Sequence, residues 1–486
     1  MSQTASKAIY ESELNDYVNK EKSAISLISS IGNLLYDKSI ELVLFRNPLV
    51  DQSVSEILSL HKSTGEVTGN QVNVEDSAAL ALELDNIDVA PSKIDIGRLA
   101  SEWSKEKGDF SSINDFLTTK LSGFKSDDSN TLEPKDVILY GFGRIGRLAA
   151  RELIKQAGKG QQLRLRAIVV RNNSEDQIKK RASLLRMDSV HGPFPGTIYE
   201  DYENKTLIIN GQLINIIQAN HPSEIDYTQY GINDALVLDN TGVFTDKEAL
   251  SNHLKSKGVN KVILTAPGKE IPNIVYGINQ KEFGVEDHDI FSAASCTTNA
   301  ISPILKIIED NYEVEKGHIE TVHAYTNDQN LLDNYHKKPR RGRSAAINMV
   351  ITSTGAGKAV TKVIPSLSGK LTANAVRVPT PNGSLAIMNL TVKKEMDVDS
   401  LNEMVKGYAM SGDLVNQIKF SIEEELVSND IIGNTCCSVF DSHATIVSED
   451  KKNMVLYVWY DNEFGYTKQV IRLAKYVAKV RRLLYY

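Results

Sequence analysis

The feature that most constrains this sequence is a glycine-rich turn between an apolar segment and an amphipathic one. Residues 141–146 read GFGRIG and fit the pattern G-x-G-x-x-G, between an expected strand at 137–139 and an expected helix near 145–157. Glycines at this spacing let the backbone approach a pyrophosphate, while the first N–H groups of the helix point toward it. A structural glycine turn is the alternative, but the strand before and the helix after favour a dinucleotide site. Its candidate residues are Gly141, Gly143, Arg144, Ile145 and Gly146.

Apolar segments after this turn alternate with helical ones. The expected strands are 163–170, 206–209, 213–217, 235–238 and 261–265. Strands that alternate with helices indicate a parallel α/β sheet. From about residue 318 onward the apolar segments lengthen, which indicates an antiparallel sheet domain. Residues 465–483 are again helical in pattern.

The first 134 residues differ from the rest in charge and pattern. They carry a net charge of −10 and the remaining residues +3, which together give the −7 of the whole chain. Apolar residues within 25–35 recur at steps of three and four, which predicts a helix, and a second helix is expected after an N-cap at Ser112. Residues 61–70 predict a polar turn and 125–136 a linker. We therefore expect a separate, mainly helical module that carries no chemical motif.

Composition excludes several classes of protein. With 41% apolar and 24% charged residues, the chain has the composition of an ordinary folded protein. The amino terminus has no leader pattern, and no segment has the ~18–20 apolar residues of a membrane helix. Three cysteines cannot form a disulfide framework, and none has metal-ligand spacing, so no metal site is expected. Short basic segments occur at 339–343 and at the end of the chain, but the near-neutral charge balance does not indicate a nucleic-acid-binding surface. We expect a cytoplasmic protein.

The end of the second strand bears on which dinucleotide is bound. An NAD site usually has an Asp or Glu there, which accepts a hydrogen bond from the ribose 2′-hydroxyl. Here the strand continues into Arg171, whose guanidinium can instead pair with the 2′-phosphate of NADP. The alternative is that Arg171 is solvated and that Glu175 or Asp176 contacts the ribose. The sequence favours NADP use, alone or beside NAD.

Cys296 is the candidate nucleophile. It lies at the expected start of a helix, where the dipole and unpaired N–H groups stabilise a thiolate and predict a pKa below the usual value of about 8.5. Cys436 and Cys437 lie in an expected strand, where small buried hydrophobes are the rule. His323 ends an apolar strand and could serve as the base of a Cys–His pair. These residue types alone leave the pairing open, because most histidines have no catalytic role.

Nine segments occur in the order found in phosphorylating glyceraldehyde-3-phosphate dehydrogenases. They are GFGRIG (141–146), DSVHG (188–192), DNTGVF (239–244), SCTTN (295–299), HAYTNDQ (323–329), RRGRSAA (340–346), STGAGKAV (353–360), RVPTPNGS (377–384) and WYDNEFGY (459–466). The chain resembles this family over about residues 136–486, and its first 134 residues resemble the extension of the long-form members.

The resemblance implies a fold and an assembly. The fold is an α/β Rossmann-type parallel-sheet cofactor domain plus an α+β catalytic domain with an antiparallel sheet, preceded by a mainly helical extension. The implied boundaries are 1–134 for the extension, 135–294 for the NAD(P)-binding domain, completed by a C-terminal helix at 462–486, and 295–461 for the catalytic domain. The family is commonly homotetrameric, so a homotetramer is expected.

The resemblance also implies a reaction, the reversible oxidation of glyceraldehyde 3-phosphate to 1,3-bisphosphoglycerate in glycolysis and gluconeogenesis. Cys296 would attack the aldehyde, and His323 would remove the hydroxyl proton while hydride passes to NAD or NADP. Inorganic phosphate would then release the acyl group from a Cys296 thioester. A close alternative is the related dehydrogenase of erythrose 4-phosphate, which hydrolyses its acyl intermediate. Another alternative is a dehydrogenase whose extension adds a regulatory or scaffold role.

Further roles follow from the matching positions of the family. The substrate phosphate would be bound by Thr326, Asp328 and Arg377. Inorganic phosphate would be bound by Ser295, Thr297, Arg343, Thr354 and Gly355. Further cofactor contacts would come from Thr241, Gly242, Thr265, Asn462 and Tyr466. Arg340 and Arg341 would belong to a solvated basic loop.

Three positions depart from the family pattern. Arg171 and the two asparagines after it replace the usual Asn-Asp, which puts strict NAD use in doubt. Ala300 replaces a second cysteine found in some members, and Asp328 stands where some members have another small polar residue.

Overall fold

The computed structural model describes residues 3–69, 71–126 and 132–486, and the chain forms two compact units. The first unit comprises Met1–Pro134, Gly158–Gln162 and Val480–Tyr486, and the second comprises Lys135–Ala157 and Leu163–Lys479. The expected linker at 125–136 includes residues 127–131, which lie outside the described residues.

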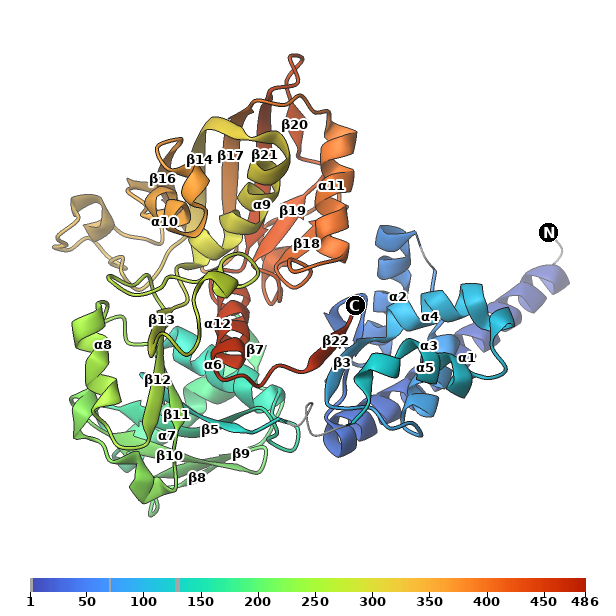
Figure 1. The fold of residues 1–486 in the computed structure, drawn as a ribbon, viewed down its shortest axis with the longest axis horizontal. Coiled ribbons are helices and arrows are strands. Elements are labelled where there is room, and N and C mark those ends of the chain that lie inside the picture. The colour runs from blue at the N-terminus through green and yellow to red at the C-terminus, as the bar shows by residue number, and fades with distance from the viewer. Residues whose placement is uncertain (1–2, 70, 127–131) are drawn as a thin grey trace. The chain divides into compact units, whose positions relative to one another are not determined.

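The first unit is mainly helical, as the sequence predicts (Figure 1). Its helices are α1 (Gln3–Lys38), α2 (Val54–Thr68), α3 (Val74–Leu84), α4 (Ile96–Glu106) and α5 (Ile113–Lys120). Ser112 caps α5 as predicted, because its side chain accepts a hydrogen bond from the N–H of Asp115. The predicted buried face of α1 is only partly right. Ile31, Leu34 and Leu35 of that face are buried, whereas Ile25 is 59% exposed.

The polar turn predicted at 61–70 is wrong over its described residues. Helix α2 continues to Thr68 and ends at Gly69, which has a φ of +68° and donates its N–H to the carbonyl of Gly65. A capping box formed by Ser53 and Glu56 fixes the start of this helix. The buried ring of His61 hydrogen-bonds to the carbonyl oxygen of Ile57 and to the hydroxyl of Ser77. Because its polar atoms have partners inside the unit, this segment can be helical although its composition is polar.

A four-stranded sheet of order β2–β1–β3–β22 completes the first unit. Its strands are β1 (Glu41–Leu44), β2 (Asn47–Pro48), β3 (Ser92–Asp95) and β22 (Leu483–Tyr485). Strand β22 pairs in parallel with β3, so the helix expected over 465–483 and the C-terminal helix implied at 462–486 are both wrong for the final residues, which belong to the first unit. Helix α12 (Phe464–Val477) ends earlier, and Lys479 adopts a φ of +57°. The expected basic segment at the terminus is also partly wrong, because Arg482 is buried and pairs with Glu41 at 3.1 Å.

The cofactor part of the second unit is a sheet of order β13–β12–β11–β4–β5–β10–β9–β8. Its strands are β4 (Lys135–Tyr140), β5 (Leu163–Val170), β8 (Ile198–Asp201), β9 (Thr206–Ile209), β10 (Gln212–Gln218), β11 (Ala235–Asp239), β12 (Val259–Leu264) and β13 (Ile290–Ser292). Neighbours from β13 to β10 are parallel, which confirms the predicted α/β sheet. Its helices are α6 (Arg144–Lys155), α7 (Glu175–Arg186) and α8 (Lys247–Leu254). The strand order reverses between β4 and β11, and ligands of such sheets bind at the carboxyl ends of strands beside this point.

An antiparallel extension follows the parallel strands. Strands β9 and β10 form a hairpin whose turn is Asn210–Gly211, with φ values of 47° and 77°. Positive φ at both turn positions is typical of a tight hairpin, and Asn-Gly is its usual sequence. Both strands were expected from their apolar pattern, but their antiparallel pairing was not.

The catalytic sheet has the order β15–β16–β14–β17–β21–β19–β18, with β20 paired to β21. Its strands are β14 (Val314–Ala324), β15 (Val350–Thr352), β16 (Leu371–Val378), β17 (Ser384–Val392), β18 (Ile418–Ser421), β19 (Ser438–Asp441), β20 (Ile446–Val447) and β21 (Asn453–Tyr460). Most neighbours are antiparallel, as expected, but β14–β16 and β18–β19 are parallel. Parallel pairs need a crossover, and α10 (Ala356–Val363) lies within the one between β14 and β16.

Helix α9 (Cys296–Tyr312) lies across the catalytic sheet and contacts β14, β17, β19 and β21 (Figure 1). Its Ile301, Ile304 and Ile308 are fully buried, as their spacing predicts. Helix α11 (Val398–Met410) packs near the sheet edge at β18, and α12 contacts both α6 and α9. Among the described residues, no helix combines the length and the apolar composition that would let it cross a membrane.

Candidate active site

The glycine turn has the geometry that its sequence predicts. Gly141 has a φ of +93°, and a Cβ there would lie 2.9 Å from Cγ2 of Thr241. A Cβ on Gly146 would lie 2.5 Å from the carbonyl oxygen of Gly141, so the turn tolerates no side chain at either position. A Cβ on Gly143 would meet no described atom within 4 Å. The main chain at Gly143, the N-cap of α6, is therefore accessible to a ligand.

Arg144 follows the turn but directs its side chain into an ion-pair network. Its Nε donates to Glu463 at 2.8 Å, its Nη2 pairs with the same carboxylate, and its Nη1 lies 2.5 Å from Asp188. His191 lies 3.0 Å from Glu463. Glu463 precedes α12, so the network ties the first turn of α6 to α12. Because its side chain is held by carboxylates, Arg144 can bind a dinucleotide only through its main-chain N–H. Ile145, the second residue of α6, offers a main-chain N–H in the same turn.

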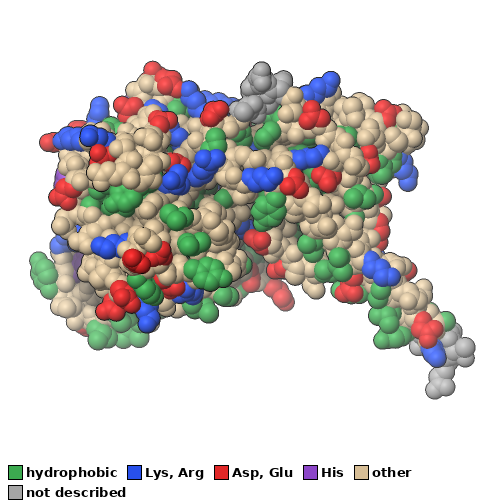
Figure 2. Space-filling model, turned by 90° about the horizontal axis from the view of Figure 1, so that it is seen from below, with side chains coloured by type: hydrophobic (Ala, Val, Ile, Leu, Met, Phe, Trp, Pro, Cys, Tyr) green, Lys and Arg blue, Asp and Glu red, His purple; other side chains and the backbone are tan. Residues whose placement is uncertain are grey.

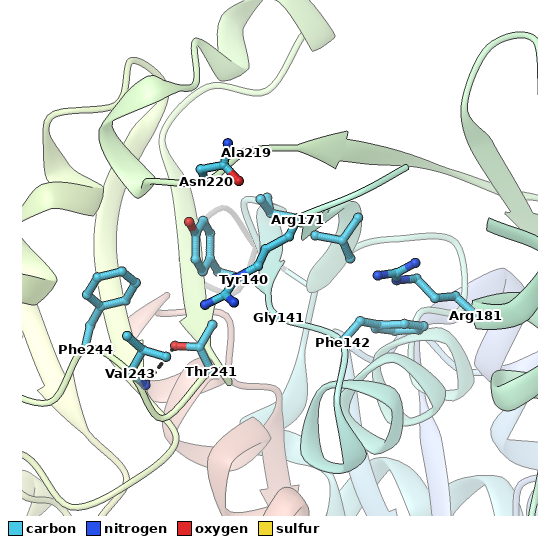
Figure 3. Close-up of a pocket in the computed structure, with 12 residues that line it drawn as sticks. Tyr140, Gly141, Phe142, Arg171, Arg181, Ala219, Asn220, Thr241, Val243 and Phe244 are labelled. Carbon is cyan, nitrogen blue, oxygen red and sulfur yellow. Dashed lines mark hydrogen bonds between the residues drawn. The ribbon is translucent and has the colours of Figure 1, made fainter. Parts of the chain in front are cut away.

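A cavity of about 340 Å³ opens beside the glycine turn (Figure 3). Its lining combines residues from the carboxyl ends of several strands with one residue of α7. The lining residues are Tyr140, Gly141, Phe142, Val169, Val170, Arg171, Arg181, Ala219, Asn220, Thr241, Val243 and Phe244. Burial raises the pKa of Tyr140 to about 12, while the nearby Arg171 lowers it slightly. Glu175 and Asp176 are exposed in the first turn of α7 and do not line the cavity.

The loop after β11 forms the other side of the turn. The N–H and hydroxyl of Thr241 both donate to Asp239, and Gly242 adopts a φ of +67°. Thr265 donates both its N–H and its hydroxyl to the carbonyl oxygen of Asp239. Two of the three predicted cofactor residues of this region, Thr241 and Thr265, therefore bind one buried aspartate at the reversal point of the strand order, and Gly242 directly follows Thr241.

Cys296 is the first residue of α9, as the sequence predicts. Ser295 caps the helix, since its hydroxyl accepts the N–H of Thr298 at 3.0 Å. Asn299 donates to the carbonyl oxygens of Ala293 and Ser295, which holds the segment before the helix. The cysteine is thus fixed at a capped helix start.

His323 lies at the end of β14 and faces this cysteine. Its Nε2 is 3.6 Å from the Sγ of Cys296, and its Nδ1 is 2.7 Å from the carbonyl oxygen of Ala324. Nη1 of Arg377, which can only donate, also lies 3.0 Å from Nδ1, but it donates to the same carbonyl oxygen of Ala324. The shorter contact of Nδ1 is to this carbonyl, which can only accept, so we assign the proton of the neutral ring to Nδ1. The lone pair of Nε2 is then directed at the thiol, which is the arrangement needed for a general base.

The electrostatics of the pair differ from the prediction for Cys296. Burial raises the pKa of the Cys296 thiol, and Arg377 is the largest opposing influence. The predicted low pKa at a helix start is therefore wrong for the free chain, because the surrounding protein disfavours the thiolate more than the helix end favours it. Burial and the charge of Arg377 lower the pKa of His323 to about 3. The pair is a neutral thiol beside a neutral imidazole, so the thiol becomes nucleophilic by transferring its proton to Nε2.

Arg377, on β16, lies beside this pair. Its Nη1 donates to the carbonyl oxygen of Ala324 at 2.9 Å and lies 3.4 Å from the hydroxyl of Thr326. Its Nε is buried and has no partner among the described residues. Burial lowers the pKa of Arg377, and the charge of the Cys296 thiolate, once it forms, is the largest opposing influence. A buried guanidinium that has a free donor next to a nucleophile is suited to an anionic substrate group.

Four charged residues between positions 328 and 343 were assigned either to an anion site or to a solvated loop, and each contacts a neighbour in the structure. Asp328 pairs with Arg341, whose side chain is 11% exposed and also donates to Thr352. The expectation of a solvated Arg341 is therefore wrong, since a carboxylate holds it within the fold. Arg340 is exposed and donates to the carbonyl oxygen of Ile351. Arg343 is exposed and pairs with Asp333 at 3.0 Å, so it is not directed at Cys296 in this structure.

Hydroxyls and one helix start complete the predicted phosphate sites. Thr297 lies 3.1 Å from the hydroxyl of Tyr460 and 4.0 Å from the Sγ of Cys296. Gly355 is the N-cap of α10, and the hydroxyl of Thr354 accepts the N–H of Ala356 at 3.2 Å. Helix α10 contacts α9. Because the N–H of Ala356 is donated to Thr354, an anion at the start of α10 would have to bind to the other N–H groups of the first turn.

The segment after β21 supplies the remaining predicted cofactor residues. Asn462 is buried, and its Oδ1 accepts the hydroxyl of Ser384 at 2.8 Å, which orients the amide. Tyr466 is buried in α12 and donates to the carbonyl oxygen of Ala294, two residues before Cys296. Tyr466 therefore adjoins the segment that leads to the nucleophile, whereas Asn462 is held by the first residue of β17.

Sequence reasoning missed several residues that the fold brings to these sites. Arg181 lines the cavity beside the turn, Tyr460 holds Thr297, and Ser384 orients Asn462. Tyr460 and Ser384 lie within segments that the motifs cover, so the motifs contained a signal for them. Arg181 had no such signal, because its side chain reaches the cavity only through the packing of α7 against the sheet.

The residues fit a dinucleotide. The pyrophosphate can lie at the start of α6, because Gly143 has no Cβ that would block it. The adenosine half can lie in the cavity at the strand ends. Together with the thiol–imidazole pair, this fold and site define an oxidoreductase that binds a dinucleotide on a Rossmann sheet.

Comparison with known proteins identifies the family. Residues 135–247 match the model for the glyceraldehyde 3-phosphate dehydrogenase NAD binding domain, and residues 295–462 match the model for the C-terminal domain of the same enzyme. The chain belongs to the glyceraldehyde-3-phosphate dehydrogenase family.

Relatives of two lengths match the chain. A glyceraldehyde-3-phosphate dehydrogenase-like protein of Pseudomonas aeruginosa is 48% identical over 93% of this chain and 98% of its own length. The glyceraldehyde-3-phosphate dehydrogenases of Priestia megaterium and Bacillus subtilis are 41% and 39% identical over 70% of this chain and 97% of their own lengths. The first alignment leaves out only about 34 residues (7% of 486), so it includes most of the extension.

Proposed function

We propose that this chain oxidises glyceraldehyde 3-phosphate to 1,3-bisphosphoglycerate, reversibly and through a thioester on Cys296. The observation that carries the proposal is the 3.6 Å distance between Sγ of Cys296 and Nε2 of His323, with Nδ1 of the ring fixed by Ala324. Family membership supports the substrate, since relatives that are 38–41% identical carry the name of that dehydrogenase.

The proposed chemistry begins with proton transfer from the Cys296 thiol to Nε2 of His323 as Sγ bonds to the aldehyde carbon. Nε2 then gives this proton to the former aldehyde oxygen, which leaves a hemithioacetal and a neutral imidazole. The hemithioacetal then loses its hydroxyl proton to Nε2 as its hydride leaves, which converts the bound acyl group to a thioester. The bound NAD or NADP supplies the hydride acceptor. An oxygen of inorganic phosphate attacks the thioester carbon, and Sγ leaves as a thiolate that His323 reprotonates.

Two anion sites support a phosphorylating reaction. The free buried Nε of Arg377 and the hydroxyl of Thr326 lie near the thiol–imidazole pair and suit the phosphate of the substrate. The start of α10 at Gly355 and the hydroxyls of Ser295 and Thr297 suit the attacking phosphate. Asp328 binds Arg341 in the free chain, so we propose that its role is to hold this arginine near the anion sites.

The proposal is tested by assaying glyceraldehyde 3-phosphate and erythrose 4-phosphate, each with and without phosphate. Turnover of the three-carbon aldehyde that requires phosphate is the expected result. Phosphate-independent turnover of erythrose 4-phosphate, faster than that of the three-carbon sugar, would overturn the proposal and identify the hydrolysing relative. A Cys296→Ser chain should bind cofactor but lack oxidation, whereas Cys437→Ser, at a buried cysteine away from the pair, should retain it.

We also propose that the cofactor is NADP, alone or beside NAD. Arg171 supports this proposal, because it follows the end of β5 and lines the cavity. It therefore puts a guanidinium where an NAD site usually has a carboxylate. The ratio of kcat/KM for NADP to that for NAD tests it, and a strong preference for NAD would contradict the role of Arg171.

We propose further that the chain assembles as a homotetramer through its catalytic part. Leu331, Leu332, Tyr335, Ile347 and Met349 are between 72% and 89% exposed, which is unusual for large apolar side chains clustered within one short stretch of chain. Sedimentation of the intact chain tests this proposal. A monomer at micromolar concentration would contradict it.

The extension is proposed to affect assembly or partner binding. The amino-terminal half of α1 exposes Ile9, Tyr10, Leu14 and Tyr17 by 47–67%, and Figure 2 shows hydrophobic side chains along this arm of the first unit. If deletion of residues 1–134 left oligomeric state, stability and regulation unchanged, this proposal would be lost.

A further inference from the structure

The cavity beside the glycine turn contains two guanidinium groups from different elements. Arg171 follows the end of β5, and Arg181 lies in the second turn of α7. Figure 3 shows both side chains at this pocket, Arg171 beside Tyr140 and Arg181 beside the ring of Phe142. The sequence without the fold gives no reason to pair these arginines, because nine residues lie between them.

The arginines in the described lining of this cavity have no carboxylate beside them in that lining, although Asp239 and Glu224 act on Tyr140. The described lining contains two arginines and no Asp or Glu. The nearest acidic residues along the chain, Glu175 and Asp176, are exposed in the first turn of α7 and lie outside the lining. Burial lowers the pKa of Arg181, and no carboxylate opposes that effect. Desolvating a cation without a counter-ion costs free energy, so a site with this arrangement is suited to an anionic ligand.

Arg181 is held in place by one neighbour. Its Nη1 donates to the carbonyl oxygen of Gln177 at 3.0 Å and to the Oε1 of the same residue at 2.9 Å. Both acceptors lie one turn earlier on α7 and use a single nitrogen of the guanidinium. Nε and Nη2 keep their donors, and the double contact to Gln177 restricts the side chain that presents them.

The position of the cavity indicates which anion it receives. In a Rossmann sheet the pyrophosphate lies at the glycine turn, and the end of the second strand contacts the adenosine ribose at its 2′ position. Arg171 occupies that strand end here. An anion near both Arg171 and Arg181 would therefore be attached to the ribose, away from the pyrophosphate.

We propose that Arg181 and Arg171 together bind the 2′-phosphate of the adenosine ribose, with Arg181 as a specificity-determining residue for NADP and Gln177 as its positioning residue. This inference rests on the proposed function only in placing the adenosine half of the dinucleotide in this cavity. A phosphate monoester carries about −1.5 to −2 charges, and two guanidinium groups neutralise it better than one.

The test uses ligands that contain only the adenosine half, so it does not depend on catalysis. Binding of 2′,5′-ADP and of 5′-ADP to the intact chain is measured by calorimetry. We expect 2′,5′-ADP to bind at least tenfold more tightly. Arg181→Gln should weaken 2′,5′-ADP at least tenfold and 5′-ADP less than twofold, and Arg181→Lys should restore part of the loss.

Lys180→Gln is the matched control, because it removes one positive charge from an exposed position adjacent to Arg181 on α7. It should leave both affinities unchanged. Gln177→Leu should weaken 2′,5′-ADP by an intermediate factor and leave 5′-ADP unchanged, because it frees Arg181 without removing its charge.

Three outcomes would overturn the inference. Equal binding of the two ligands by the native chain would remove the 2′-phosphate site. Equal weakening of both ligands by Arg181→Gln would make Arg181 a structural residue. A preference that Arg171→Gln abolishes and Arg181→Gln leaves intact would assign the site to Arg171 alone. Each outcome is distinct from failure of the proposed dehydrogenase activity, which is measured separately with glyceraldehyde 3-phosphate.

Discussion

The Nε2 of His323 and the Sγ of Cys296 lie 3.6 Å apart, although one residue ends a strand and the other begins a helix. The contact depends on α9 crossing the catalytic sheet so that its capped start lies at the end of β14. Since Nδ1 of the ring is committed to Ala324, the imidazole presents an acceptor to the thiol.

The first prediction concerns the protonation of Cys296. Burial raises the pKa of this thiol, so its thiolate fraction should keep increasing with pH throughout the neutral range. The rate of Cys296 alkylation by iodoacetamide in the free chain should therefore rise from pH 7 to pH 9 without a plateau. Peptide mass spectrometry assigns the alkylated cysteine. A rate that levels off below pH 7 would show a standing thiolate and contradict this account.

Replacement of His323 by Asn should lower kcat by about 10²- to 10⁴-fold, because the acceptor for the thiol and hydroxyl protons is lost. Cofactor affinity should be unchanged, since His323 does not line the cavity beside the glycine turn. Because the pKa of His323 is about 3, the native chain should show no loss of kcat/KM near pH 6.5 from this residue. An acidic limb centred near 6.5 that vanishes in the His323→Asn chain would contradict the low pKa of His323, and an unchanged kcat in that chain would contradict its role as the base.

Replacement of Arg377 by Gln should act on both substrate and nucleophile. The KM for the aldehyde should rise at least tenfold, as the buried donor at Nε is removed. Alkylation of Cys296 at a fixed pH should also become slower, because Arg377 is the main influence that lowers the pKa of this thiol. Arg340→Gln, at an exposed arginine, is the control and should change neither quantity. Faster alkylation of the Arg377→Gln chain would be inconsistent with the electrostatics described above.

Asp188 should contribute to stability in a pH-dependent way. Burial alone would raise the pKa of Asp188. The N–H groups of His191 and Val190 and the charge of Arg144 together outweigh this effect and lower the pKa to about 2. A depressed pKa stabilises the fold above the unfolded value of 3.8, and this contribution is lost as the pH falls through about 2. Asp188→Asn should lower the free energy of unfolding at pH 7 by roughly 1–2 kcal/mol. The difference from the native chain, measured in urea, should shrink between about pH 4 and pH 2, and a difference independent of pH would count against the ion pair.

The carboxyl terminus should be required for the first unit. Arg482 is buried and pairs with Glu41, so Glu41→Gln leaves a buried cation without its partner and should cost about 3–5 kcal/mol. Arg482→Met combined with Glu41→Gln should be less destabilising than Glu41→Gln alone. Hydrogen exchange of β3 reports the effect locally, because β22 pairs with this strand. Additive losses in the double variant would refute the coupling.

Local signals in the sequence predicted the dehydrogenase part well. The parallel strands, the turn at Gly141 and the helix after Cys296 follow from apolar periodicity and glycine spacing, which depend on neighbouring residues only. The extension was predicted as helical, but the helix through His61 was not, because its stability comes from caps and buried polar contacts.

Features that depend on tertiary packing were beyond prediction. The pKa of Cys296 depends on how densely the fold surrounds the thiol, which outweighs the local effect of the helix start. The pairing of Asp328 with Arg341 and the place of Arg181 in the cavity require the loop and helix positions. The return of β22 to the first unit joins residues at opposite ends of the chain, and no local pattern encodes it.

The most direct test of the central claim is a single-turnover measurement in the absence of phosphate. The chain is mixed with cofactor and glyceraldehyde 3-phosphate, reduced cofactor is followed by absorbance, and the protein is analysed by mass spectrometry. We predict a burst of about one reduced cofactor per chain, an acyl adduct on the peptide that contains Cys296, and release of that adduct when phosphate is added. Sustained turnover without phosphate, or a burst of the same size in the Cys296→Ser chain, would contradict the thioester mechanism.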